Sequence, residues 1–432
     1  MSAGVGNNYW LTTTTMPGAT AGELRARVDV VVIGAGFTGL SAARTLARNG
    51  ASVAVLEANT IGWGASSRNG GMVLTGLKLS AEKLAKRYGM ELTRRMYASS
   101  LESIDLVEQI VREEKIECSF GRCGHLEVAS KQSHFDAYAR SVELIAKEFS
   151  HELRIVPRSE LKDEIGSRIY FGGIVDETSA GVNPAQYVSG LASAALRTGA
   201  CVYENARVQQ ISSDSRNGDS GFLVVTSRGS VFARDVLVAT SGYTSVATPA
   251  LQKKIVPIGS FIVATEKLPE GLAHELSPRN RMIFDSKHYL HYYRLTPDNR
   301  MLFGGRAAFF PETQNTIQQS AAILREDMMD VYPQLRDTKV EHAWGGTLDF
   351  CFDTMPHCGE RDGIHFALGY SGHGVAMATY LGTKIAENLC GAKNEIPFAA
   401  IQFLGAPLGL YNGKPWFLPF AGAYYKVLDW IS

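Results

Sequence analysis

The sequence has no excess charge of either sign, because its 43 basic and 43 acidic residues cancel. This balance gives no electrostatic basis for binding nucleic acid or an anionic membrane, so we expect neither as a partner. Cysteine is scarce: the chain has six, none of them in a CxxC pair, which is typical of reduced thiols in the cytoplasm. Cys351, His357 and Cys358 are close in the sequence but lack a second pair of ligands, so we expect no metal site.

Long apolar runs are also missing. The N-terminal segment lacks the basic start and apolar core of a signal peptide, and we interpret residues 1–27 as a flexible lead-in. The only long uncharged segment, residues 396–413, is interrupted by Pro397, Pro407 and several glycines, which disfavours a membrane-spanning helix. The aromatic residues that follow, between 416 and 425, fit either a membrane-surface patch or packing on the body of the protein, and we favour packing.

What the sequence does contain is a complete βαβ motif for binding a dinucleotide. A β-branched run over residues 28–33 predicts a buried parallel strand, and residues 34–39 are Gly-Ala-Gly-Phe-Thr-Gly. A helix is expected from there to about Asn49, followed by a second strand over residues 52–56 and by Glu57. Because strand, helix, strand and acid all occur in order, the segment indicates a nucleotide site rather than an ordinary glycine turn.

Each glycine of this motif has a steric role. Gly34 allows the tight turn out of the strand, Gly36 lets the backbone approach a pyrophosphate, and Gly39 lets the helix pack closely on the strand. The free amides and positive dipole end of the helix suit a diphosphate. Glu57 stands 21 residues after Gly36, a spacing that suits hydrogen bonds from ribose hydroxyls and disfavours a 2′-phosphorylated cofactor. The motif alone does not separate NAD from FAD.

The rest of the chain predicts a second domain, because 432 residues exceed one typical core. The strand that ends at Thr240 leads into Ser241-Gly242-Tyr243, a turn that fits the bottom of a nucleotide site or a plain sheet edge. We expect helices over about 79–114, 132–149, 184–198 and 321–331, short strands between 202 and 240, and an antiparallel sheet over 253–310.

A tyrosine-rich segment, residues 287–294, is a candidate for a substrate pocket. The alternation of a strand puts Tyr289, His291 and Tyr293 on one face, and His288, Leu290, Tyr292 and Arg294 on the other. One face therefore carries aromatic rings with hydrogen-bonding groups. The pattern fits a pocket for an amine, and equally an amphipathic strand whose tyrosines pack in the core.

A second glycine-lined helix start occurs far along the chain. Residues 369–374 are Gly-Tyr-Ser-Gly-His-Gly, between a short strand that begins near residue 366 and a helix that runs to residue 389. Its unpaired amides and positive dipole end suit negative charge, such as the charge at N1 and O2 of a reduced flavin. With the loop Arg68-Asn69-Gly70-Gly71, it favours a flavin over a nicotinamide.

These segments together resemble the D-amino-acid oxidase-type flavoprotein superfamily, and within it the gamma-glutamylputrescine oxidase group. The resemblance rests on VVIGAGFTGLSAARTLARNG, LEANTIGWGASSRNGGMV, YYRLTPDNRMLFGG and GYSGHGV, and it extends from about Val28 to Tyr425. It implies an α/β plus α+β fold, with a Rossmann-like FAD-binding domain around a parallel sheet and a substrate domain with a large antiparallel sheet. The implied FAD-binding domain takes residues 28–85, 172–250 and 342–432, and the substrate-binding domain takes 86–171 and 251–341.

The resemblance also implies which residues hold FAD. Glycines of the first motif would hold the diphosphate, and Glu57 would bind the ribose. The second glycine turn would contact the pyrimidine end of the flavin. The full set is Gly34, Gly36, Phe37, Thr38, Gly39, Glu57, Ala58, Ala65, Ser66, Arg68, Asn69, Gly70, Gly71, Met72, Val208, Thr240, Gly242, Gly346, Gly372, His373, Gly374 and Val375.

Three features depart from the sarcosine-oxidase branch of the superfamily. Ala376 stands where that branch has a lysine that grips a substrate carboxylate, so a simple N-methylamino acid is not the expected substrate. Residues 301–304 contain no oxygen-activating lysine, which leaves the electron acceptor open between O2 and another molecule. The flavin-tethering cysteine would fall near Gly346, and Cys351 is offset from it, so we expect non-covalent FAD.

We therefore expect an FAD-dependent amine oxidase of the cytoplasm that oxidises a C–N bond in γ-glutamylputrescine or another N-substituted amine. A hydride would pass to flavin N5, the imine would hydrolyse to an aldehyde, and electrons would pass to O2 to give H2O2. His373 is the expected flavin-side contact, and Tyr293 and Arg294 are expected to orient the substrate; structural roles for all three are the alternative.

Rival functions are a D-amino-acid or opine dehydrogenase that reduces a quinone, and a non-catalytic flavin-binding subunit for electron transfer. The sequence does not predict the exact amine or the oligomeric state.

Overall fold

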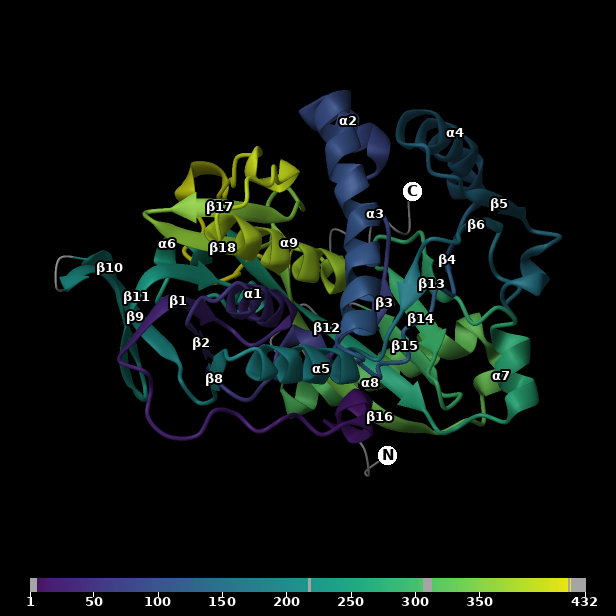
Figure 1. The fold of residues 1–432 in the computed structure, drawn as a ribbon. Coiled ribbons are helices and arrows are strands. Elements are labelled where there is room, and N and C mark those ends of the chain that lie inside the picture. The colour runs from purple at the N-terminus through teal and green to yellow at the C-terminus, as the bar shows by residue number, and fades with distance from the viewer. Residues whose placement is uncertain (1–5, 217–218, 306–312, 419, 421–432) are drawn as a thin grey trace.

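The computed structural model describes residues 6–216, 219–305, 313–418 and 420, which form two large sheets with helices packed around them (Figure 1). The α-helices are α1 (Phe37–Arg48), α2 (Ala81–Tyr88), α3 (Met90–Glu113), α4 (Gln132–Phe149), α5 (Pro184–Arg197), α6 (Pro249–Gln252), α7 (Glu270–Leu276), α8 (Gln314–Val331) and α9 (Gly374–Leu389). The strands are β1 (Arg27–Ile33), β2 (Val53–Leu56), β3 (Met72–Val73), β4 (His125–Val128), β5 (Arg154–Pro157), β6 (Gly172–Asp176), β7 (Ala180–Gly181), β8 (Cys201–Tyr203), β9 (Val208–Arg216), β10 (Asp219–Thr226), β11 (Gly229–Val238), β12 (Ile255–Thr265), β13 (Met282–Asp285), β14 (His291–Leu295), β15 (Met301–Gly305), β16 (Val340–Cys351), β17 (His357–Arg361) and β18 (Ile364–Leu368).

The first sheet is built around the N-terminal βαβ motif. Its strand order is β17-β18-β11-β1-β2-β8, and the β9–β10 hairpin continues from β11. β1 pairs in parallel with both β2 and β11, and β11 pairs in parallel with β18. Val30 and Val32 face the core formed with α1, α5 and α9, whereas Val31 faces a second core on the opposite side. Burial on both faces explains why this strand is a run of β-branched residues.

The second sheet has the order β16-β12-β15-β14-β13-β4-β6-β5 and is antiparallel except where β13 pairs with β4. One face packs on α8, with Tyr293 and Phe303 buried in that core. The opposite face meets the loop that follows the βαβ motif: the Trp344 indole donates a hydrogen bond of 3.0 Å to the carbonyl of Arg68. A parallel-containing sheet beside a large antiparallel one confirms the predicted fold class.

The predicted domain boundaries need correction at three elements. β6 and most of β16 were assigned to the FAD-binding domain, but both strands belong to the antiparallel sheet. α3 was assigned to the substrate domain, but its residues Met96 and Ile104 pack in the core with α1 and α9. Sheet membership depends on which distant strand pairs with a segment, and the local sequence does not contain that information. The division into two domains itself remains a proposal.

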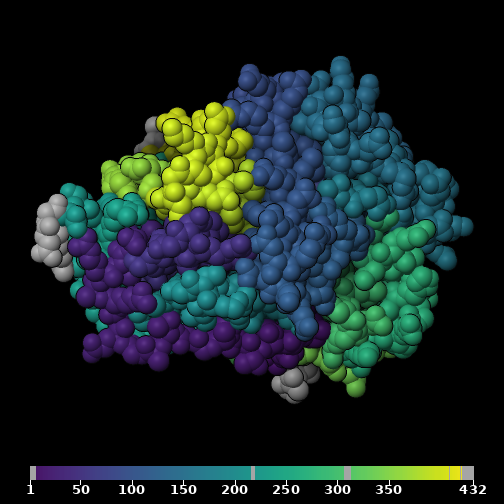
Figure 2. All heavy atoms as spheres, in the orientation of Figure 1, coloured from purple at the N-terminus to yellow at the C-terminus, as the bar shows by residue number. Residues whose placement is uncertain are grey.

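The N-terminal lead-in is not a flexible segment over residues 8–13. Trp10 is fully buried, and its indole donates a hydrogen bond of 2.9 Å to the carbonyl of Asn69. Asn8 donates one of 2.8 Å to the carbonyl of Ser67. In Figure 2 this purple segment lies along the surface next to α5, where Gln186 donates to the carbonyl of Thr13. The segment therefore braces the loop over residues 67–69 from outside.

Local differences from the expected elements have local causes. The helix predicted over 79–114 is two helices, because Gly89 adopts φ +82° between α2 and α3. The tyrosine-rich strand begins only at His291, and residues 287–290 form a loop. Asn183 and Pro184 start α5 as expected, since the Asn183 side chain accepts hydrogen bonds from the amides of Ala185 and Gln186.

The C-terminal aromatic segment is partly packed on the protein. Tyr411 is buried and donates a hydrogen bond of 2.7 Å to the carbonyl of Ile255, whereas Trp416 and Phe420 are exposed. Tyr424 and Tyr425 lie outside the described residues. Within the described ranges, no helix has the length and apolarity needed to cross a bilayer.

Candidate functional site

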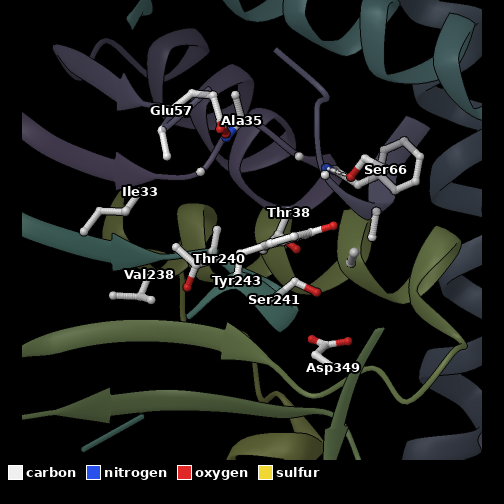
Figure 3. Close-up of a pocket in the computed structure, with 18 of the residues that line it drawn as sticks. Ile33, Ala35, Thr38, Glu57, Ser66, Val238, Thr240, Ser241, Tyr243 and Asp349 are labelled. Carbon is white, nitrogen blue, oxygen red and sulfur yellow. Dashed lines mark hydrogen bonds between the residues drawn. The ribbon is translucent and has the colours of Figure 1, made fainter. Parts of the chain in front are cut away.

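The starts of α1 and α9 open onto one cavity with an empty volume of about 1320 Å³, part of which is open to solvent (Figure 3). Residues from both sheets and from the connecting loops surround it. The predicted residues that line it are Gly34, Gly36, Phe37, Thr38, Glu57, Ala58, Ala65, Ser66, Asn69, Val208, Thr240, Gly372, Gly374 and Val375. Both glycine-lined helix starts, which are hundreds of residues apart in the sequence, therefore border the same space.

The first helix start has the shape that a bound diphosphate requires. Gly34 adopts φ +106°, and a Cβ on Gly36 would lie 2.8 Å from the Ser66 hydroxyl. A Cβ on Gly39 would lie 1.9 Å from the carbonyl oxygen of Gly34, so only glycine lets α1 approach the end of β1 this closely. Gly36 has no side chain to cap α1, but the Phe37 amide donates a hydrogen bond of 2.9 Å to the Ser66 hydroxyl. The amides that follow in the first turn of α1 are the ones suited to bind an anion.

Glu57 is held in place at the tip of β2. Its carboxylate accepts a hydrogen bond of 2.8 Å from the Ala35 amide (Figure 3). It accepts another, of 2.9 Å, from the Asn59 amide. Burial raises the pKa of Glu57, and these amide hydrogen bonds counteract the rise because they favour the charged form. The fixed carboxylate beside the cavity is suited to accept hydrogen bonds from ribose hydroxyls.

The two helix starts are joined directly. The hydroxyls of Thr38 on α1 and Tyr370, before α9, are 2.7 Å apart and share a hydrogen bond. Further along α9, a Cβ on Gly382 would lie 2.2 Å from the carbonyl oxygen of Thr38. This glycine therefore permits the close packing of α9 on α1 that brings both starts to the same cavity.

Asp349 on β16 forms part of the opposite wall and was not predicted from the sequence. Its carboxylate accepts a hydrogen bond of 2.8 Å from the Gly369 amide, and its carbonyl accepts one of 3.0 Å from the Ser371 amide. Burial raises the pKa of Asp349 to about 6. These contacts fix the second glycine turn, in which Ser371 has φ +51° and Gly372 has φ +93°.

Other lining residues were also missed, because only the folded chain brings them to the cavity. Tyr243 belongs to the turn that the sequence left open between a nucleotide site and a sheet edge, whereas no local pattern marks Trp63 or Leu348 as neighbours of a nucleotide. The remaining unpredicted lining residues are Ile33, Ala35, Leu56, Asn59, Gly64, Arg207, Val238, Ala239, Ser241, Ser245, Ala247, Thr248, Asp349, Tyr370 and Ala378. Gly64, which follows Trp63, indicates that the chain is approached closely at this point. A Cβ on Gly64 would lie 2.9 Å from the ring of Tyr243.

Several predicted cofactor residues support the cavity from behind or border it. Arg68 donates to the carbonyls of Trp63 at 2.7 Å and Gly345 at 3.2 Å, and so ties the loop to β16. A Cβ on Gly242 would lie 2.9 Å from the carbonyl oxygen of Leu348. The predicted residues that are not among the lining residues are Gly39, Arg68, Gly70, Gly71, Met72, Gly242, Gly346 and His373, and their contact with a cofactor remains a prediction.

The predicted substrate role of Tyr293 is wrong, because its side chain lies on the other face of the sheet. Tyr293 is fully buried in the core under α8, where its ring stacks on Phe303 at 5.2 Å. Its hydroxyl donates a hydrogen bond of 2.8 Å to the hydroxyl of Tyr170. The alternation of the strand was predicted correctly, but the face that meets the cofactor side carries Tyr292 instead.

Arg294 is on the cofactor side, where its Nε and Nη1 bond backbone groups. Its guanidinium donates to the carbonyls of Val182 at 3.0 Å, Leu295 at 3.1 Å and Gly71 at 3.2 Å. Burial lowers the pKa of Arg294 to about 10. Arg294 therefore holds the loop at Gly71 against the start of α5, and its predicted contact with a substrate carboxylate stays a prediction.

His373 is the N-cap residue of α9, next to the lining residue Gly374. Its Nδ1 is buried without a hydrogen-bond partner among the described residues. Burial, with smaller effects of the charges on Lys78 and His125, lowers the pKa of His373 to about 3. The imidazole is therefore neutral near pH 7, and its role as a flavin contact remains a prediction.

Cys351, Asp353 and His357 come together with their ligand atoms within 4.8 Å of one another. His357 Nε2, however, already bonds both carboxylate oxygens of Asp353, at 3.0 and 3.1 Å. Cys358, the third member of the set considered from the sequence, packs in a different core from Cys351. We interpret the group as a buried hydrogen-bonded pair beside a thiol.

The cavity fits an extended dinucleotide. Uncapped helix amides at the α1 start suit its diphosphate, the fixed carboxylate of Glu57 suits a ribose, and the uncapped α9 start suits the anionic end of a flavin. None of the described lining residues is a cysteine. Non-covalent attachment of FAD remains a prediction.

Comparisons with known proteins agree with this geometry. The sequence profile of the family described as "DAO: FAD dependent oxidoreductase" matches residues 29–388. The chain is 32% identical to Gamma-glutamylputrescine oxidoreductase from Escherichia coli over 93% of its own length and 92% of that protein. It is 33% identical to Probable oxidoreductase OrdL from Haemophilus influenzae over the same shares of both chains.

Solved structures share the fold at lower identity. Glycine oxidase from Geobacillus kaustophilus superposes with a TM-score of 0.74 at 20% identity, covering 88% of this chain and all of the other. L-amino acid deaminase from Proteus vulgaris, without its specific insertion sequence, superposes with a TM-score of 0.71 at 17% identity, covering 89% of this chain and 96% of the other.

Proposed function

The chain belongs to the DAO family of FAD-dependent oxidoreductases, and on that premise we propose that it oxidises the C–N bond of an amine similar to γ-glutamylputrescine. It is an enzyme that uses FAD and acts on an amine or amino acid. The observation that carries the finer proposal is the similarity to Gamma-glutamylputrescine oxidoreductase over 93% of the chain.

The residues of the cavity would hold FAD in an extended form. Backbone amides at the α1 start would bind the diphosphate, Glu57 would bind a ribose, and the turn before Gly374 would lie at the flavin end. The chemistry that FAD would supply there is acceptance of a hydride from the α-carbon of the amine, and water would hydrolyse the resulting substrate imine to an aldehyde with release of an amine or ammonia.

The surroundings of the flavin end favour a neutral amine. Tyr292 packs on Gly70, and His373 is uncharged near pH 7. A site enclosed by such groups disfavours an ammonium ion, so the substrate nitrogen would react in its neutral form without a strong protein base. Ala376 offers no cation for a substrate carboxylate next to the reacting carbon.

We propose O2 as the electron acceptor, with H2O2 as the product, and a cytoplasmic location. The six cysteines are all without disulfide partners in the structure, which is typical of a reducing compartment. A membrane quinone is the second candidate acceptor, because Trp416 and Phe420 expose 63% and 73% of their surface close to the C-terminus.

The proposal is tested by anaerobic reduction of the purified, FAD-loaded protein. We expect γ-glutamylputrescine to bleach the flavin absorbance much faster than sarcosine or D-alanine does. Admission of air should then restore the colour with about one H2O2 formed per flavin. Inertness towards every amine, or a preference for D-alanine, would overturn the proposal. Recovery of the colour only with a quinone analogue would move the assignment to a dehydrogenase.

A further inference from the structure

The cofactor-side face of the antiparallel sheet carries a carboxylate that the proposed chemistry does not use, Glu127 on β4. Its neighbours Leu126 and Val128 are fully buried in the core under α8. Because successive side chains of a strand point to opposite faces, Glu127 and His125 point to the cofactor side. Tyr292 shares that side, where a Cβ on Gly70 would lie 3.2 Å from its ring.

The register of the sheet places Glu127 at a defined distance from the flavin end. Tyr292 on β14 is directly opposite Phe284 on β13, and Phe284 is directly opposite Glu127 on β4. These strands lie side by side in Figure 1. Neighbouring strands are about 4.8 Å apart, so Glu127 lies about 10 Å across the sheet from Tyr292.

The Glu127 carboxylate is incompletely satisfied. It accepts a hydrogen bond of 3.2 Å from the Tyr138 hydroxyl of α4, and the described part of the chain places no cation within ion-pair distance of it. Burial raises the pKa of Glu127, while the Tyr138 hydrogen bond and the charge of Lys78 act in the opposite direction. The side chain remains partly exposed. A carboxylate in such a place is stabilised by a cation that binds to it.

Two histidines, His125 on the same strand and His373 at the start of α9, also have unused hydrogen-bonding capacity. His125 is 9% exposed, its ring stacks on Phe284 at 4.2 Å, and its Nε2 has no hydrogen-bond partner among the described residues. His373 Nδ1 has none either, and His373 adjoins the FAD cavity through Gly374. On β4 and at the start of α9, the described residues therefore leave hydrogen-bonding capacity unused, which a ligand could satisfy.

We propose that Glu127 determines substrate specificity by binding a second, distal ammonium group of the substrate. The inference rests on the proposed function, because it takes the reacting amine to lie at the flavin end near Tyr292. In an extended γ-glutamylputrescine, about 10 Å separates the oxidised carbon from the α-ammonium, by ordinary bond lengths. A substrate bound along the row from Tyr292 to Glu127 would place its reacting carbon at one end and its ammonium at the other.

The test compares two substrates and three proteins by steady-state kinetics. Glutarylputrescine has the length of γ-glutamylputrescine but lacks the α-ammonium. In the wild-type enzyme we expect its KM to be about 10- to 100-fold higher, the usual effect of losing a charged hydrogen bond, with kcat changed less than about threefold. Glu127→Gln should raise the KM for γ-glutamylputrescine to that of the analogue. Glu143→Gln, the same change at an exposed position of α4, should leave both values unchanged.

The outcomes separate this inference from the proposed function. If γ-glutamylputrescine reduces the flavin but the wild-type KM is equal for both substrates, the role of Glu127 is overturned and the amine oxidation stands. An unchanged preference in Glu127→Gln that still binds FAD overturns it as well. Should Glu127→Gln fail to bind FAD, the comparison of the two substrates in the wild-type enzyme tests the inference instead. Glu127→Asp keeps the charge and should retain part of the preference for γ-glutamylputrescine over glutarylputrescine. If no amine reduces the wild-type flavin, both proposals fail.

Discussion

Gly382 is the point at which the packing of α9 on α1 can be perturbed without touching the cavity. A Cβ there would lie 2.2 Å from the Thr38 carbonyl oxygen and 3.0 Å from the Thr38 carbonyl carbon, and both are backbone atoms of α1. Ordinary contact begins at 3.4 Å, so the helices would have to separate by about 1 Å. Because Thr38 and Tyr370 link the two helix starts, this separation would break their hydrogen bond and widen the cavity.

The magnitude of the Gly382→Ala effect follows from two opposing terms. Overpacking against backbone costs about 1–3 kcal/mol, and replacing a mid-helix glycine by alanine returns about 1 kcal/mol. We therefore expect a net loss of about 1 kcal/mol in unfolding free energy. The affinity for FAD should fall about tenfold, since one end of the cofactor site moves against the other.

Differential scanning fluorimetry and flavin absorbance per protein measure these two effects. The matched control is Gly271→Ala in α7, where an added Cβ meets no atom within 4 Å. This variant should show only the increase in stability that comes from the higher helix propensity of alanine. If Gly382→Ala melts at or above the wild-type temperature and retains all of its FAD, as the control should, the close approach of α9 to α1 does not shape the site and the reasoning fails.

Two further predictions concern the antiparallel sheet. His291 is bonded to Asp285 at 3.2 Å and Asp327 at 3.0 Å; although burial opposes protonation, these carboxylates raise its pKa to about 9, above its usual 6.5. Protonated His291 should contribute on the order of 3 kcal/mol to the unfolding free energy. This contribution should be complete below pH 6.5 and disappear as the pH rises through about 9. Urea unfolding at pH 6 and pH 10 should show this loss in the wild type and not in His291→Gln; an equal loss in both would contradict it. Tyr293→Phe removes a buried hydroxyl bonded to Tyr170, so it should lower the unfolding free energy by about 1 kcal/mol and leave the KM for the amine unchanged. A severalfold change in KM with unchanged stability would instead restore the role first predicted for this residue.

The parts of the site that could be predicted from the sequence are those fixed by steric limits along a short segment. Gly34 needs its positive φ, and Gly39 needs to lack a Cβ, whatever the rest of the chain does. The cofactor motif was therefore recognised before the structure. Asp349 and Tyr370 could not be assigned in the same way, because they reach the cavity only when β16 pairs with β12 and α9 packs on α1.

The errors have the same origin. Strand alternation separates Tyr292 from Tyr293, but it does not say which of the two faces meets the cofactor, and that depends on where α8 packs. The burial of Trp10 was missed because it stands in a segment rich in threonine, and its partner, the carbonyl of Asn69, belongs to a distant loop. In each case a contact between segments far apart in the sequence decided the outcome.

The two sides of the site are therefore built on different principles. The cofactor side consists largely of backbone amides and glycines at the starts of α1 and α9, whose geometry tolerates little change. The facing sheet presents side chains from β4, β13 and β14, including Glu127, Phe284 and Tyr292, and these can change without altering the strand pairing. The glycine motifs accordingly predict the cofactor, and on our proposal the choice of amine would depend on the residues of this sheet face, with the carboxylate of Glu127 at its far end.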